Sequence, residues 1–271
     1  MKRIETIREI QLVELEILKK TVRFLEDNNL TYILCGGTML GAVRHGGFIP
    51  WDDDVDLLVP RKDYDRLLFE LDTTPLECEG LKVLKPGDDW YRLPFIKVVD
   101  TSTQAEEDAV RDCFNSGGLW VDIFPMDHFP DSHKEHVKFV KKNKFWCKIL
   151  ASYTEPGGTE HWKLISRIVH IILYFLCGGS KRITRKIDSL GRKLNSKYIT
   201  SDHMGNGARP ENIKNYYSAA VIENLLKRKF EDSEFFIPQD YEAYLVPVYG
   251  NYMEIPPEDK RRIHHVRAYR L

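Results

Sequence analysis

Four aspartates crowd into residues 52–56, directly before an apolar run that ends at Pro60. On an extended strand alternate side chains share a face, so Asp54 and Asp56 are expected to project together while Val55 points to the opposite side. Two carboxylates side by side repel each other, and one of them stays protonated unless a cation compensates the charge. A hard divalent ion with oxygen ligands fits this pair, with Mg²⁺ as the first choice and Mn²⁺ as the alternative. We therefore expect Asp54 and Asp56 to hold one or two metal ions.

Surface charge is the alternative interpretation of the acidic run. Asp-rich segments are commonly solvated loops, and Pro50 favours a loop for Asp52 and Asp53. Apolar residues follow Asp54 and Asp56, however, and predict a strand that packs against the rest of the protein. For these two residues we favour metal binding over surface charge.

Two more features belong with the acidic pair. Gly36-Gly37 stands between an apolar segment and a short helical one, where a glycine turn exposes backbone N–H groups to a phosphate, and Thr38 is placed to cap the helix. Asp122 is an isolated acid in the apolar segment LWVDIFPMD, and burying it is costly unless it is paired or bound to metal. A glycine turn, an acidic pair and a third acid are the parts of a phosphoryl-transfer site of the nucleotidyltransferase type. Asp122 would serve either a second metal ion or the proton of the attacking hydroxyl.

Four other side chains are candidates for binding the substrate: Arg44, His45, Trp51 and Lys97. The three basic residues can place positive charge on a diphosphate, or they are surface cations and partners of nearby aspartates. Trp51 can stack on a base or face a quaternary ammonium, or it simply packs beside Pro50.

Periodicity divides the chain into an α/β first part and a helical second part. We expect helices over 3–28, 38–44, 60–71, 132–150, 160–177 and 180–197, and strands over 31–35, 55–60, 81–85, 92–100 and 119–127. The pattern fits an α/β or α+β sheet domain in residues 1–130, and we take α+β as the expected fold class. Residues 131–271 would form a mostly helical part that faces the acceptor substrate and shares the core.

Composition excludes several classes of protein. Forty basic and forty-one acidic residues give a net charge of -1, which argues against nucleic acid as a partner. The five cysteines form no C-x-x-C pair, and the N-terminus is too charged for a signal peptide, so we expect reduced thiols in a cytoplasmic protein. The apolar segment 164–179 is too short to span a membrane. It is either a buried helix or, because basic residues flank it, a helix that contacts a membrane surface.

Two long segments resemble a known family. CGGTMLGAVRHGGFIPWDDDVDLLVPRKDY, residues 35–64, is similar to the signature of the LicD family, whose bacterial members attach phosphocholine to cell-surface glycans and whose fukutin-related relatives transfer ribitol phosphate. FFIPQDYEAYLVPVYGNYMEIPPEDKRRIHH, residues 235–265, resembles the C-terminal pattern of the same family. His264 and His265 in this pattern belong either to a solvated tail or to a phosphate-binding or catalytic group. Residues 131–210 carry no motif of the family.

The resemblance implies that the mixed sheet has a nucleotidyltransferase-like fold. It also implies a donor activated by CDP, such as CDP-choline, and release of CMP. It assigns the catalytic metal to Asp54 and Asp56, with Asp122 as the third acid. The donor phosphates would lie against Gly36, Gly37 and Thr38. The implied acceptor is a lipid-linked teichoic acid or other glycan precursor at the inner face of the plasma membrane, where the 164–179 segment would contact lipid.

Other functions fit the same residues. In a second enzymatic interpretation the nucleotide itself is transferred and pyrophosphate is released. The acidic ligands would serve this reaction as well, because they do not indicate which phosphorus is attacked. A metal-dependent glycosyltransferase also uses an Asp-x-Asp pair, although the glycine turn and the third acid fit it less well. A non-catalytic nucleotide-binding scaffold is the alternative outside enzymes.

Overall fold

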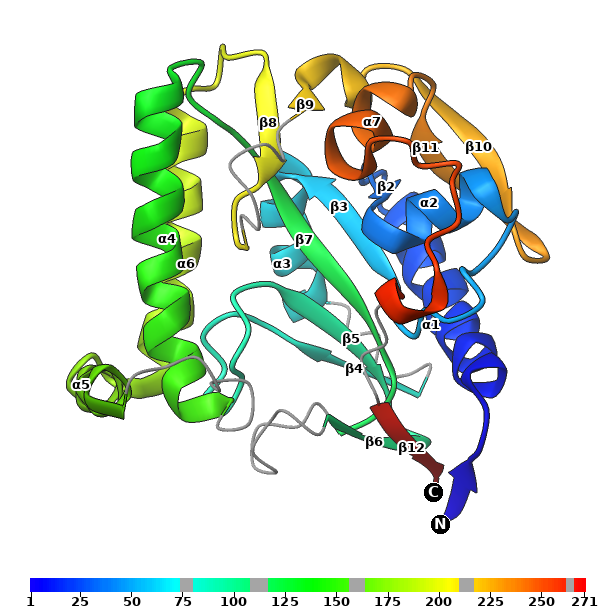
Figure 1. Ribbon diagram of the computed structural model, residues 1–271, viewed down its shortest axis with the longest axis horizontal. Helices are drawn as coiled ribbons and strands as arrows, with labels where there is room; N and C mark the ends of the chain where they lie inside the picture. The colour runs from blue at the N-terminus through cyan, green and yellow to red at the C-terminus, as the bar shows by residue number, and fades with distance from the viewer. Residues whose placement is uncertain (74–79, 108–116, 156–163, 210–216, 262–265) are drawn as a thin grey trace.

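The computed structural model describes residues 1–271 except 74–79, 108–116, 156–163, 210–216 and 262–265. Its centre is a mixed sheet in which strands β2, β3, β7, β5 and β4 are neighbours in that order, and β8 and β9 extend it beyond β7 (Figure 1). The strands are β2 (Ile33–Leu34), β3 (Asp56–Pro60), β4 (Leu81–Leu84), β5 (Ile96–Asp100), β7 (Trp120–His128), β8 (His203–Asn206) and β9 (Tyr217–Ser218). Only β3 and β7 pair in parallel; the other described pairs of this sheet are antiparallel.

Two smaller sheets flank the central one. One has the strand order β1-β12-β6, and the other is the hairpin β10-β11. Their strands are β1 (Lys2–Ile4), β6 (Thr103–Glu107), β10 (Leu225–Phe230), β11 (Ser233–Pro238) and β12 (Val266–Arg270). Pairing of β1 with β12 brings the first and last described strands together, as Figure 1 shows at its lower edge.

Helix α1 (Ile7–Asp27) lies against strands β5 and β7 and forms one side of the acidic site described below. It begins with a capping box: Thr6 Oγ1 accepts from the Glu9 backbone N–H at 3.2 Å, and the Glu9 carboxylate accepts from the Thr6 N–H at 3.1 Å. The remaining helices around the sheet are α2 (Gly36–Arg44), α3 (Arg61–Thr73), α7 (Glu242–Tyr249) and the 3₁₀ turns η3 (Ala219–Ile222) and η4 (Glu258–Lys260).

Three helices make up the expected helical part: α4 (His133–Thr154), α5 (Leu164–Leu176) and α6 (Gly179–Lys197). Helices α4 and α6 lie side by side, and α5 crosses at their lower end, away from the sheet (Figure 1). They have a small core of their own around Leu150, Tyr174 and Ile187. The expected α+β class, with a mixed sheet and a helical C-terminal part, is confirmed.

The interpretation of 164–179 as a buried helix is wrong for its described residues. Tyr174 is buried, but Ile172, Phe175 and Leu176 expose 53%, 58% and 75% of their surface. The reason is that α4 and α6 cover only one side of α5, and no other described helix covers the opposite side. No described helix combines the length and apolarity needed to cross a membrane.

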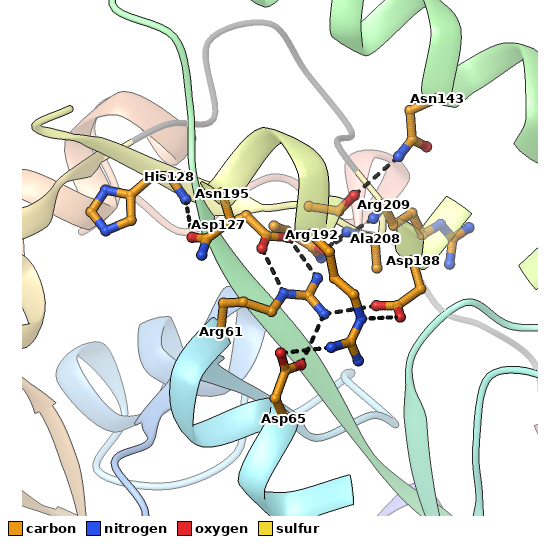
Figure 2. Close-up of polar contacts among 12 residues, drawn as sticks. Arg61, Asp65, Asp127, His128, Asn143, Asp188, Arg192, Asn195, Ala208 and Arg209 are labelled. Atoms are coloured by element: carbon orange, nitrogen blue, oxygen red, sulfur yellow. Dashed lines mark hydrogen bonds and ion pairs between the residues drawn. The ribbon is translucent and has the colours of Figure 1, made fainter. Parts of the chain in front are cut away.

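A buried ionic network fastens the helical part to the sheet (Figure 2). Arg61 of α3, 4% exposed, forms a two-pronged ion pair with Asp127 of β7, at 2.6 and 2.7 Å, and its Nη1 lies 2.7 Å from Asp188 Oδ1 of α6. Arg192 extends the network to Asp188 and to Asp65. Asp127 is five residues beyond Asp122 on β7, so in a regular strand the two acids project to opposite faces of the sheet. The network therefore has a structural role separate from the acidic site.

Candidate active site

The acidic segment lies where β3 begins. The expectation that Asp54 and Asp56 alternate within one strand is wrong, because β3 starts at Asp56 and residues 52–55 have no regular secondary structure. β2 pairs only with Leu57 and Leu58, so no strand supports the segment on that side. On the other side, Val55 O accepts from the Asp122 N–H at 2.9 Å and keeps the segment beside β7.

Helix α2 begins against these carboxylates. Gly36 and Gly37 are the first two residues of the helix and not a preceding turn, and Cys35 rather than Thr38 is the N-cap. A β-carbon on Gly36 would lie 3.0 Å from Asp56 Oδ2, and one on Gly37 would lie still closer to Asp52 Oδ2. The glycines thus let two carboxylates approach the positive end of the helix dipole.

Two hydrogen bonds hold this arrangement together. Thr38 Oγ1 accepts from the Asp56 backbone N–H at 2.9 Å, which ties α2 to the start of β3. The Gly36 N–H, one of the donors left without a helical partner, points to the Tyr244 hydroxyl of α7 at 2.9 Å. Tyr244 was not singled out from the sequence, where only its place in a tyrosine-rich C-terminal pattern was visible.

Asp56, Asp122 and Lys97 form a row across three adjacent strands. The register pairs Asp56 with Asp122 on β3 and β7, and Asp122 with Lys97 on β7 and β5. The Lys97 ammonium lies 3.1 Å from Asp122 Oδ1 and 3.7 Å from the centroid of the Trp120 ring. Lys97 is 2% exposed, so it is a buried partner of Asp122 and not a surface cation.

Burial dominates the electrostatics of Asp122. Removal from water raises its pKa; Lys97 offsets part of this, and the charge of Asp54 raises it again. Asp122 Oδ1 accepts no hydrogen bond, although the Lys97 ammonium is near. The carboxylate therefore has the Lys97 ammonium as its charge partner and one oxygen without an aligned hydrogen bond.

The other expected substrate-binding residues gather at the end of α2. Arg44 Nη1 donates to the carbonyl oxygens of Tyr252 and Glu254 at 2.9 and 3.2 Å, and so joins α2 to the C-terminal segment. The His45 ring stands edge-on to Trp51, with centroids 6.3 Å apart.

A cation already faces Trp51. The guanidinium carbon of Arg261 lies 4.3 Å from the centroid of the Trp51 ring. Arg261 was missed as an individual residue, although it belongs to the quoted C-terminal pattern. His264 and His265 of that pattern lie outside the described residues.

The residues at the site suit a hard cation in their chemistry. Carboxylate oxygens are the ligands that Mg²⁺ and Mn²⁺ prefer, and Asp122 Oδ1 is a buried oxygen with no hydrogen bond. Within the described residues, no three His, Cys, Asp or Glu side chains are arranged as a ready metal site. Metal binding by Asp54, Asp56 and Asp122 therefore remains a prediction.

Comparison with known proteins agrees with the resemblance seen in the sequence. Residues 29–162 match the family model described as "LicD/FKTN/FKRP, nucleotidyltransferase domain", so the protein is of the transferase class that this domain defines. Residues 29–162 therefore form a domain of the LicD family.

Relatives extend the comparison beyond the matched domain. The chain is 26% identical to "Lipopolysaccharide cholinephosphotransferase LicD" of Haemophilus influenzae over 98% of both chains. It is 34% identical to human "Ribitol 5-phosphate transferase FKRP" over 122 residues, which are 41% of this chain and 21% of the human one. Both relatives are named as transferases of phosphate-linked groups, and the present protein is a transferase of this general kind.

Proposed function

We propose that the protein transfers phosphocholine from CDP-choline to a sugar hydroxyl of a teichoic acid or another cell-surface glycan precursor, and releases CMP. The observation that carries this proposal is the similarity to the Haemophilus cholinephosphotransferase over 98% of both chains. The row of Asp56, Asp122 and Lys97 supports it, because it offers the acids that such a transfer needs.

In this proposal Asp54 and Asp56 would hold Mg²⁺, which when bound would offset the charge of the donor diphosphate. The acceptor oxygen forms a bond to the distal phosphorus, and the bond from that phosphorus to the oxygen of CMP breaks. The proton of the acceptor hydroxyl passes to Asp122. A pKa raised by burial suits Asp122 to this role, because a base works best when its pKa approaches the working pH.

Transfer of ribitol 5-phosphate from a CDP-linked donor is a second candidate. It is favoured by the 34% identity to the human ribitol 5-phosphate transferase, although that match covers only 122 residues. The two candidates share the chemistry and differ in the group that is moved.

Titration calorimetry with CDP-choline, with and without Mg²⁺, tests the donor first. We expect binding that needs Mg²⁺, followed by CMP as the released nucleotide when an acceptor glycan is added. Release of pyrophosphate would identify a nucleotidyltransferase, and release of an intact nucleoside diphosphate a glycosyltransferase. Binding of CDP-ribitol in place of CDP-choline would keep the reaction and replace the donor.

The acceptor proposed here is lipid-linked, and α5 offers a surface that would contact the membrane. Residues 133–197 contain 15 Lys and Arg but 4 Asp and Glu, in a chain whose net charge is -1. An exposed apolar helix face within a strongly basic region is typical of proteins that bind anionic lipid surfaces.

A double variant, Phe175→Ser with Leu176→Ser, is expected to bind vesicles of anionic lipid at least about tenfold more weakly than the wild type. The reason is that two apolar side chains that become buried in the lipid contribute a few kcal/mol to binding. Co-sedimentation measures this partitioning. Phe69→Ser, which removes an exposed aromatic side chain from α3, is the matched control and should bind as the wild type does. Equal sedimentation of all variants would contradict membrane contact through α5.

A further inference from the structure

Helix α1 carries a buried carboxylate that none of the interactions described above uses. Glu14 is 0% exposed, and neither of its carboxylate oxygens accepts a hydrogen bond. An ionised carboxylate in such surroundings is among the most costly groups that a protein can bury. Its presence requires either a proton or a cation.

The neighbours of Glu14 place it against the acidic segment. Gln11, one turn earlier on the same helix face, donates from its amide to Ile49 O at 3.1 Å and to Asp52 O at 2.9 Å. These bonds fix the backbone of the segment on α1. Glu14 thus faces the segment from the helix side.

The charges that act on Glu14 agree with this placement. Burial raises its pKa most, and the charges of Asp54, Asp53 and Asp52 raise it further. Lys97 acts in the opposite direction, but its ammonium already pairs with Asp122. No described cation forms an ion pair with Glu14.

Packing alone does not account for an acid at this position. Most residues on the same buried side of α1, including Ile10, Leu15, Ile17 and Leu18, are apolar, and Glu14 is the only acid among them. Leucine or glutamine would fill the space without the cost of a buried charge. Two buried oxygens without hydrogen bonds, on the helix face that Gln11 joins to the acidic segment, are instead the kind of ligand that a hard divalent cation prefers.

We propose that Glu14 supplies, from helix α1, a further oxygen ligand to the divalent cation that the proposed function assigns to Asp54 and Asp56. The inference rests on that metal dependence and adds a ligand outside the Asp-rich segment. It also couples cation binding to stability, because an ion held by both elements ties α1 to the start of β3.

Mn²⁺ binding to the isolated protein, followed by electron paramagnetic resonance, tests the inference without donor or acceptor. Glu14→Gln keeps the shape of the side chain and removes the charge. We expect its Kd for Mn²⁺ to rise at least about tenfold, because loss of even an outer partner of a metal site has such an effect. Without metal the variant should have a higher melting temperature than the wild type. Addition of Mn²⁺ should raise the melting temperature of the variant less than that of the wild type.

Thr21→Val is the matched control. Thr21 lies two turns further along α1, is also buried, and has a hydroxyl without a hydrogen-bond partner. Its replacement should change the melting temperature without changing the Kd for Mn²⁺.

A wild-type Kd in Glu14→Gln would overturn the inference and leave the proposed function intact, since Glu14 would then be a protonated structural residue. A wild-type protein that binds no Mn²⁺, with or without CDP, would overturn the inference together with the metal assignment. CMP release measured in chelator would then test the transfer reaction by itself.

Discussion

Asp56→Asn is expected to lower kcat/KM for transfer by at least about a thousandfold, which corresponds to roughly 4 kcal/mol of transition-state stabilisation. Asp56 is the acid with the most constrained position: its backbone N–H is bound by Thr38, and its carboxylate lies against Gly36. Asparagine keeps the size of the side chain but cannot offset a metal charge. Initial rates of CMP release at saturating Mg²⁺ and donor measure the effect.

The control for Asp56→Asn is the same substitution at Asp89. That carboxylate is exposed and pairs with Lys181 on the surface, so its loss should leave the rate unchanged. The hydrogen bond from the Asp56 N–H to Thr38 is a backbone contact, and the variant should therefore retain the fold, as circular dichroism can verify. Turnover at the wild-type rate in Asp56→Asn would remove Asp56 from the catalytic site.

Arg61→Met is expected to lower the free energy of unfolding by about 3–5 kcal/mol, the usual cost of breaking a buried ion pair from one side. The substitution leaves Asp127, whose side chain is fully buried, without its two-pronged partner, and Asp188 loses one of its two arginines. Urea unfolding followed by tryptophan fluorescence measures the change.

Arg66→Met is the matched control for this prediction, because Arg66 is on the same helix but is half exposed. It pairs with the half-buried Asp63 and donates to the carbonyl oxygens of Asn28 and Asn29. The substitution should cost less than about 1 kcal/mol. Adding Asp127→Leu to Arg61→Met removes the carboxylate that has lost its ion-pair partner and should recover part of the lost stability. Equal losses in Arg61→Met and Arg66→Met would show that the network contributes no more than a surface ion pair.

Elements with a strong local pattern were predictable from the sequence. Helix α1 was expected over 3–28 and occupies Ile7–Asp27, since its apolar period is regular and Thr6 with Glu9 closes its first turn. Strand β7 was expected over 119–127 and occupies Trp120–His128. The position of Asp122 inside this apolar run correctly indicated that it needs a partner, and Lys97 supplies it.

The β10-β11 hairpin illustrates what the sequence hides. Strand β10 reads LLKRKF, in which three consecutive basic residues break the alternation expected of a half-buried strand. At its end Glu231 adopts a left-handed backbone conformation with φ of 59°, where glycine or asparagine would have indicated a turn. Tertiary contacts account for this choice, because the Glu231 carboxylate binds Arg8 and the Phe48 N–H.

Details of the site depended in the same way on distant segments. The strand was expected to include Asp54, whereas β3 begins at Asp56. The sequence does not show that β2 is too short to pair with the residues before Leu57. Gln11 and Glu14 were overlooked as two more polar residues in a charged helix. The available signal was their spacing of three on a side of α1 that is mostly apolar.

The contact between the Gly36 N–H and the Tyr244 hydroxyl has a consequence for biosynthesis. It joins residues 208 positions apart, so the start of α2 cannot acquire this partner until the ribosome has translated all of the sequence between them. The partners of Arg44, the carbonyl oxygens of Tyr252 and Glu254, are 208 and 210 positions away and are translated later still. The acids of residues 52–56 are therefore translated long before the segment that contacts α2, and the site is complete only after Glu254 has been translated.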